Sequence, residues 1–153
     1  MAVGDTYIEL GTGLKIATGK PATEDQAGYG ALTWTDIEGV ISLPERGDAI
    51  NDVSEPTLKD GRVEHFNGSK DGGVLTIPIK YIEGDAGQAA LIAAAGTNGT
   101  FSFQEVDSDG TQAHFYYGRV QTVMRREATP DSFKGYSSNI AVNSDRFTGT
   151  EES

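Results

Sequence analysis

The chain has 153 residues, of which 37% are hydrophobic, and its formal net charge is −11 with no cysteine. This length is enough for one buried core, so we expect a single domain over residues 1–153, rich in turns because glycine is frequent. The negative charge disfavours tight binding of nucleic acid, and the missing cysteines exclude disulfides and thiolate metal sites.

The N-terminal third is expected to contain short strands separated by polar loops. After a few flexible residues, a strand region is predicted over 7–17, and the polar stretch 20–30 is predicted to be a loop. A second strand region is predicted over 32–43 and is closed by Pro44. The N-terminus lacks the pattern of a secretory signal, and no apolar run approaches the roughly 20 residues of a membrane span.

The segment after Pro44 is mostly polar. The spacing of Ile50, Val53 and Leu58 indicates one short strand. Residues 59–73 contain four glycines and few apolar side chains, which predicts a long mobile loop. Loops of this length in compact domains are usually functional or disordered.

A half-buried strand is predicted over 74–82, because apolar side chains alternate there with polar ones. Pro78 favours an edge position or a bulge, since proline cannot donate to a neighbouring strand. The side chains expected on the buried face of this strand are Leu75, Ile77, Ile79 and Tyr81.

One short helix is predicted at about 85–95. Asp85 is a candidate N-cap, Gln88 completes a capping-box pattern, and Gly96 stands where the helix should end. The spacing of Gln88, Leu91, Ile92 and Ala95 places them on one buried face.

The C-terminal third is predicted to be a hairpin followed by one more strand and a polar tail over 146–153. The turn sequence Asp107–Gly110 joins the two strands of the hairpin, and 120–126 extends the second of them. The last strand is predicted over 133–143. The side chains expected to alternate inward along these strands are Phe101, Phe103, Ala113, Phe115, Tyr117, Ile140 and Val142.

The candidate chemical motifs all have plainer structural interpretations. Residues 105–111 resemble the start of a calcium loop, but Tyr116 stands where the twelfth-position carboxylate is needed, so a hairpin turn is favoured. His65 and His114 lack the spacing of a metal pair. Arginines 125 and 126 are expected to form salt bridges. We therefore predict no enzyme activity, catalytic residue, metal or cofactor.

The order of the features resembles the major tail tube proteins of long-tailed, siphovirus-type bacteriophages, over roughly residues 33–145. The segments that carry the resemblance follow one another in the same series, and they are VISLPERGDAINDVSEPTL, KDGRVEHFNGSKDGG, VLTIPIKY, DAGQAALIAAA, TFSFQEVDSDGTQAHFYYGRV and KGYSSNIAVN.

The resemblance implies a mainly β fold, a β-sandwich or partly open barrel with one flanking helix and a long inter-strand loop. It further implies that six copies form a ring, that their strands join an intersubunit β-barrel, and that rings stack into a conduit for DNA delivery. The implied partners are the tail tip or baseplate, the tape measure and the tail terminator proteins, with DNA passing through without tight binding and with no membrane anchor. The implied location is the virion tail, assembled in the host bacterial cytoplasm.

The resemblance also assigns roles to residues. It places the helix at 85–95 outside the barrel and the loop at 59–73 in ring-to-ring contact, with candidate residues Lys59, Asp60, Arg62, Glu64, Phe66, Lys70 and Asp71. Because an acidic wall would keep DNA from adhering, we hypothesise that carboxylates face the lumen. The candidates are Glu38, Asp48, Asp52 and Glu55.

Two alternatives remain open at this point. Contractile tails, type VI-like secretion systems and gene-transfer particles use tubes of the same fold, so a tube subunit from such a machine is the first. A monomeric β-sandwich that binds carbohydrate or protein is the second, although Trp34 is the only tryptophan and gives it little support.

Overall fold

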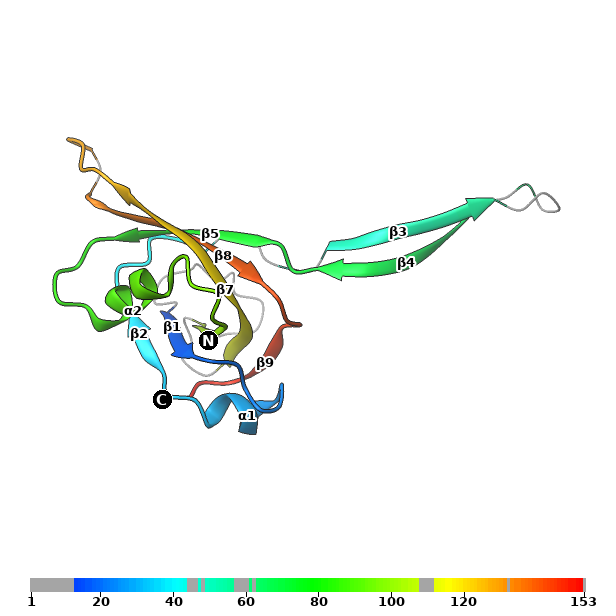
Figure 1. Ribbon diagram of the computed structural model, residues 1–153, viewed down its shortest axis with the longest axis horizontal. Coiled ribbons are helices and arrows are strands. Elements are labelled where there is room, and N and C mark those ends of the chain that lie inside the picture. Colours follow the sequence, from blue (N-terminus) through cyan, green and yellow to red (C-terminus); the bar gives the residue numbers. More distant parts are fainter. Residues whose placement is uncertain are drawn as a thin grey trace, which may run out of the picture.

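The computed structural model describes residues 13–43, 47, 49–56, 61, 63–107, 112–131 and 133–152. It is mainly β, with a curved antiparallel sheet that does not close into a barrel and a separate two-stranded sheet that projects from the body (Figure 1). This agrees with the predicted β-sandwich or partly open barrel.

The large sheet has seven strands in the order β2-β1-β6-β7-β8-β5, and β9 pairs with the first part of β7. All of these pairs are antiparallel. The strands are β1 (Gly13–Thr18), β2 (Thr35–Ile37), β5 (Val74–Lys80), β6 (Phe101–Val106), β7 (Gln112–Arg126), β8 (Gly135–Val142) and β9 (Phe147–Thr150).

The buried side chains form a main cluster under helix α2 (Ala86–Ala94) and a second cluster around Tyr29 and Phe115. The predicted alternation holds on β5 and β8 but is wrong at Tyr117, which is half-buried, because its neighbour Tyr116 is fully buried instead. On β5, Leu75, Ile77 and Ile79 are buried, whereas Tyr81 lies beyond the strand and is 38% exposed. Ile140 and Val142 of β8 are buried as predicted. The predicted hairpin is formed by β6 and β7, and β7 does extend to Arg126.

Pro78 lies in an edge strand, as predicted, because β5 ends the strand order. The Pro78 carbonyl accepts a hydrogen bond from the Ile41 amide at 3.0 Å, and the Lys80 amide donates to the Gly39 carbonyl. These even-numbered residues direct their backbone groups away from β8. The missing N–H of Pro78 therefore removes no hydrogen bond between β5 and β8.

Helix α2 (Ala86–Ala94) confirms the predicted helix and its N-cap. The Asp85 carboxylate accepts the Gln88 amide at 2.9 Å, and Gly96 adopts a φ of 77° just past the C-terminus. The predicted buried face is wrong at one position. Leu91 is 1% exposed, but Ile92 is 42% exposed, because the buried stripe runs through Gly87, Gln88, Leu91 and Ala94.

Gln88 does not complete the predicted capping box. Its side chain is buried and bonds three backbone groups from other segments. The amide nitrogen donates to the Glu38 carbonyl at 2.7 Å and to the Lys80 carbonyl at 2.9 Å, while the oxygen accepts from the Ile82 amide. Gln88 thus ties the helix to the loop after β2 and to the end of β5.

A close approach of α2 to β2 depends on Gly87. A Cβ at this position would lie 1.9 Å from the Asp36 carbonyl oxygen, so no other residue fits without displacing the helix. The helix therefore covers the core over β1 and β2 (Figure 1).

The prediction of a single helix was wrong, because a second helix, α1 (Gln26–Gly30), lies in the predicted loop 20–30. Asp25 caps it by accepting the Gly28 amide at 2.8 Å, and this bond holds the pKa of Asp25 below its ordinary value. The helix is anchored by Tyr29, which is fully buried and stacks on Phe115 at 4.9 Å between ring centroids. One aromatic side chain in a polar stretch gave no periodic signal.

The predicted polar tail was also wrong, because β9 lies within it and pairs with β7. Phe147 stacks on Tyr29 at 6.2 Å, and the Gln104 side chain exchanges two hydrogen bonds with the backbone of Glu152. Tertiary packing thus orders a segment whose sequence is polar. Among the described residues, no helix has the length and apolar character to cross a membrane.

Candidate assembly surfaces

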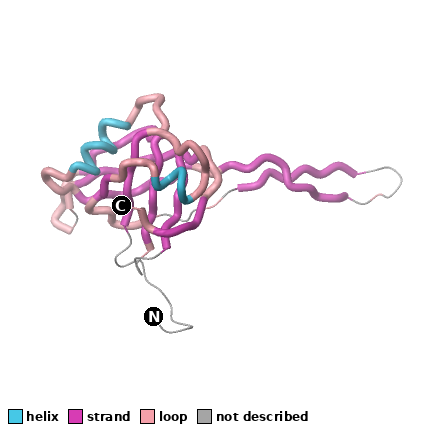
Figure 2. Tube along the Cα trace, turned by 90° about the horizontal axis from the view of Figure 1, so that it is seen from below, coloured by secondary structure: helices cyan, strands magenta, loops and turns pink. Residues whose placement is uncertain are grey.

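The second sheet is a hairpin of two strands, β3 (Ala49–Pro56) and β4 (Val63–Asp71), that pair only with each other. It extends well beyond the body in two perpendicular views (Figures 1 and 2). The predicted mobile loop 59–73 is therefore wrong over 63–71, which is a strand. Both of its faces are exposed, so the sequence carries no alternation that would reveal it.

The hairpin exposes an apolar cross-strand pair. Val53 lies opposite Phe66, and their side chains are 54% and 62% exposed. Two polar contacts also cross the hairpin, one between His65 and Asp52 at 2.7 Å and one from the Asn51 amide to the Ser69 hydroxyl at 2.8 Å. Isolated two-stranded hairpins are marginally stable in water, so a surface of this kind is expected to gain order from a partner.

The predicted ring-to-ring residues fall into two groups. Glu64, Phe66, Lys70 and Asp71 all lie on β4 and are exposed. Lys59, Asp60 and Arg62 lie outside the described residues.

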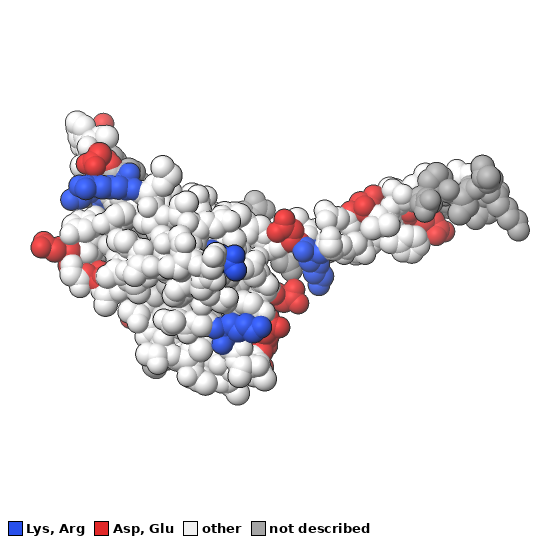
Figure 3. Space-filling model, viewed as in Figure 1, with Lys and Arg blue, Asp and Glu red and all other residues white. Residues whose placement is uncertain are grey.

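A polar hollow of about 430 Å³ lies at the base of the hairpin, lined in part by Glu24, Asp71, Tyr117 and Asp145. Burial raises the pKa of Tyr117, and the negative charges of Glu24 and Asp145 act in the same direction. The Asp71 carboxylate accepts the Gly73 amide at 2.9 Å, which fixes the turn between β4 and β5. In Figure 3 charged side chains gather near this base and at the opposite end of the body.

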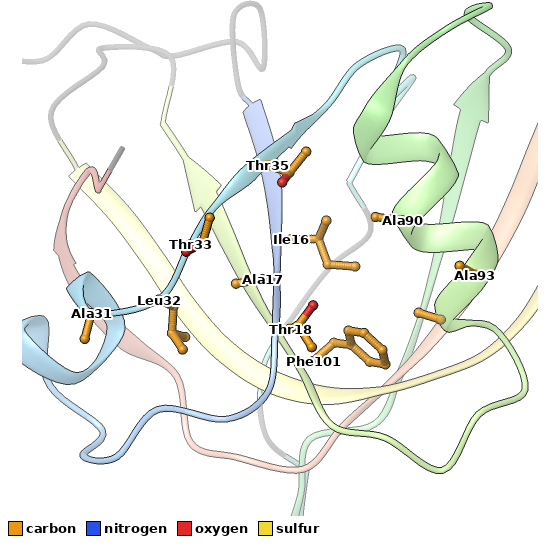
Figure 4. A pocket seen from close by; sticks show the side chains of 11 residues that line it. Ile16, Ala17, Thr18, Ala31, Leu32, Thr33, Thr35, Ala90, Ala93 and Phe101 are labelled. Atoms are coloured by element: carbon orange, nitrogen blue, oxygen red, sulfur yellow. The ribbon is translucent and has the colours of Figure 1, made fainter.

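An apolar groove of about 560 Å³ opens between helix α2, strand β1 and the segment that leads into β2. Ala90 and Ala93 form the helix wall, and Ile16 and Phe101 lie towards the floor (Figure 4). The remaining lining residues come from β1, α2, the segment before β2 and the first residue of β2, and they are Ala17, Thr18, Ala31, Leu32, Thr33, Thr35 and Ala94. Sequence reasoning missed this groove, although the run of alanines in α2 is the signal that points to it.

The face of the sheet opposite the core is uncovered by any described element over β5, β8 and β7. A row of side chains crosses its three strands: the Thr76 hydroxyl donates to the Asn139 side chain at 2.9 Å, and the Asn139 amide donates to the Thr122 hydroxyl at 3.1 Å. These groups satisfy one another while they stay in contact with water. The row carries no charge.

Among the described residues, the candidate lumen carboxylates lie in two separate places. Glu38 is exposed beside the start of α2, where its amide donates to the Asp85 carboxylate at 3.2 Å, and Asp52 lies on the projecting hairpin. Glu55 pairs in register with Glu64 on that hairpin, and Asp48 lies outside the described residues.

His114 and Arg125 have structural partners. His114 contacts the Thr148 hydroxyl at 3.0 Å and the Asp107 carboxylate at 3.4 Å, and Arg125 pairs with Glu127 at 3.1 Å. Within the described ranges, no three histidine or carboxylate side chains are grouped to hold a metal ion.

Comparison with known proteins shows which solved structures share this fold. No family model matches the chain, and no curated protein matches it. The SPP1 tail tube aligns with a TM-score of 0.58 and 14% identity, covering 92% of this chain and 78% of that one.

Two tube-terminating proteins are also similar in structure. The sheath/tube terminator of PVC, an extracellular contractile injection system, aligns with a TM-score of 0.64 and 8% identity over 96% of this chain and 99% of that one. The tube-terminating cap of the anti-feeding prophage aligns with a TM-score of 0.62 and 9% identity over 99% and 95%. The chain therefore has the fold shared by the SPP1 tail tube, the PVC sheath/tube terminator and the tube-terminating cap of the anti-feeding prophage.

Proposed function

We propose that this protein is a structural subunit of a phage tail tube. In this proposal six copies form a ring, their sheets join edge to edge, and stacked rings form the conduit through which DNA leaves the capsid. The observation that carries the proposal is the combination of a tail tube fold with a hairpin that pairs with no other strand of its own chain.

The proposed ring-to-ring contact uses the hairpin rather than a loop. Strands β3 and β4 present exposed side chains on both faces, including Glu64, Phe66, Lys70 and Asp71. A partner that covers this surface would order a segment that gains little from its own body. The hairpin would then be more ordered in the assembled tube than in the free subunit.

We further propose that the uncovered face of β5, β8 and β7 faces the channel. Its row of Thr76, Asn139 and Thr122 is polar, uncharged and internally hydrogen-bonded, which suits a wall that stays in contact with water, and the exposed Arg119 and Lys80 lie on the same face. The acidic lining through Glu38 and Asp52 is a separate hypothesis. If the uncovered face lines the channel, Thr122→Lys should slow DNA passage. If the acidic residues line it, Glu38→Lys and Asp52→Lys should slow it.

A second candidate function is a tube terminator, which the near-complete alignment with the PVC terminator favours. In that role the protein would close the end of a tube in a contractile or injection particle. The two functions differ in self-association, because a tube subunit adds ring upon ring, whereas a terminator stops after one ring.

In either role the proposed setting is a particle tail assembled in the bacterial host cytoplasm. The proposed partners are the tail tip or baseplate, the tape measure protein and other tail proteins. No enzyme activity is part of the proposal, and DNA passes without tight binding.

Light scattering on the purified protein over a wide concentration range tests the proposal. A tube subunit should pass from monomer, at 16.2 kDa, through a six-copy ring to much larger species as concentration rises. A mass that stops at one ring at every concentration would favour the terminator. A mass that stays at the monomer would favour the binding-module alternative.

A further inference from the structure

We propose that the apolar groove beside α2 is the receptor for the hairpin of a second copy, with Val53 and Phe66 as the inserted side chains. This inference rests on the proposed function and adds to it the surface on which the hairpin docks. It follows from two observations on the same chain: the exposed apolar pair of Val53 and Phe66, which we call the knob, and an apolar groove that no described element fills.

The groove has the size and lining that the knob requires. Its volume of about 560 Å³ lies within the roughly 300–1,000 Å³ of ordinary binding pockets and leaves room for an aromatic and an aliphatic side chain together. Its walls are mostly alanine and aliphatic, and its threonines, Thr18, Thr33 and Thr35, give a polar rim. An aromatic side chain that enters such a site is typical of an interface anchor.

Alanine gives the groove its depth. Ala93 is exposed on α2 and Ala90 is half-buried, and both turn short side chains towards the opening (Figure 4). A larger residue at either position would fill the space without touching the core below. The buried side of the same helix is filled by Leu91 and closed by Gly87.

The knob and the groove cannot meet within one chain. The hairpin leaves one side of the body, and α2 with β1 and β2 lies towards the opposite side (Figures 1 and 2). A contact between copies must therefore be head-to-tail, and each added copy brings a new free knob and a new free groove. Contacts of this kind continue without limit unless geometry closes them, which is how a tube elongates.

The hairpin is large enough to form a stable contact. Its strands contain 8 and 9 residues. One side of a standard protein interface has roughly 20–30 residues, so the hairpin supplies most of one side and needs only a few neighbouring contacts. Its burial on a second copy also supplies the partner that a two-stranded hairpin needs for stability.

Disulfide trapping tests the contact directly, because the natural chain contains no cysteine. The double variant Phe66→Cys, Ala93→Cys carries one thiol on the knob and one on the groove wall. Mild oxidation of assembled protein should give a ladder of covalent dimers, trimers and longer chains, since a disulfide needs Cβ atoms within about 4.5 Å. The matched control is Phe66→Cys, Ile92→Cys, whose helix position lies outside the groove and should give no ladder.

The outcomes separate this inference from the proposed function. Tubes that form without a ladder at 66 and 93 overturn the docking site and leave the tube proposal standing. A disulfide confined to single chains overturns it too, because the hairpin then folds onto its own groove. A single-chain crosslink between Ala93→Cys and Ile8→Cys overturns it in favour of the N-terminal segment as occupant. Failure of the parent protein to assemble at all overturns both proposals.

A second variant gives an independent readout that does not depend on thiol geometry. Ala93→Trp should fill the groove and raise the concentration needed for tube growth by about tenfold or more, with little change in melting temperature. Ile92→Trp on the neighbouring exposed position should leave that concentration unchanged. Equal effects of the two tryptophans would contradict the docking site.

Discussion

Val53 and Phe66 lie directly opposite each other on the projecting hairpin, and each side chain is more than half exposed. Cross-strand apolar pairs stabilise a sheet when another layer covers them, and here the described part of the chain provides no such layer. This pair therefore places an exposed apolar surface on a segment that pairs with none of the strands of the large sheet.

Replacing residues 50–70 with a short glycine-containing turn should block assembly and leave the body folded. None of the large sheet's strands pairs with β3 or β4, so their removal takes no hydrogen bond from that sheet. Thermal unfolding should stay within a few degrees of the parent protein, while sizing at high concentration should show monomers or single rings. Normal tubes from the shortened chain would refute the role of the hairpin.

Gln88→Ala should destabilise the body by about 2–4 kcal/mol, because it removes the partner of partly buried backbone groups of Glu38, Lys80 and Ile82 and opens a cavity where the buried side chain was. Urea unfolding measures this free energy. Gln121→Ala is the matched control, since Gln121 is exposed on β7, and it should change the free energy by less than about 0.5 kcal/mol. Similar losses in the two variants would contradict the bridging role of Gln88.

The two faces of α2 should respond differently to truncation. Leu91→Ala should cost about 2–5 kcal/mol of unfolding free energy, because Leu91 is 1% exposed within the main core cluster. Ile92→Ala should cost less than about 1 kcal/mol, since its side chain already lies largely in water. Similar losses in the two variants would mean that the helix packs through the face predicted from its sequence, which contained both residues.

Alkaline pH should weaken the fold through Tyr29. Burial raises the pKa of Tyr29 from 10.0 to about 12, so the folded state holds this proton more tightly than the unfolded state. The resulting stability is complete below pH 10 and is lost as the pH rises from about 10 to about 12. Tyr29→Phe should lack this loss, so its unfolding free energy should fall less steeply than that of the parent over the same range. Parallel curves for the two proteins would contradict the assignment.

Sequence patterns identified the elements whose burial imposes a period. Strand β5 alternates because Leu75, Ile77 and Ile79 face the core while Thr76 faces water. The cap of α2 was equally visible, since Asp85 bonds a residue only three positions away. Such local rules need no knowledge of the rest of the fold.

The missed elements depend on contacts made far along the chain. Helix α1 and strand β9 are ordered by the stacking of Tyr29, Phe115 and Phe147, which are distant in sequence. Strand β4 buries neither face, so its sequence resembles a loop, whereas the short strand predicted from Ile50 and Val53 is present as β3. The groove was not predicted because its walls come from three separate segments. Only the run of alanines in α2 indicates it from the sequence.

Electron microscopy of the concentrated, purified protein tests the central claim most directly. The tail tube proposal predicts stacked rings with six subunits around an open channel, and particles that lengthen as the concentration is raised. A uniform population of monomers at every concentration, with no rings or tubes, would contradict it.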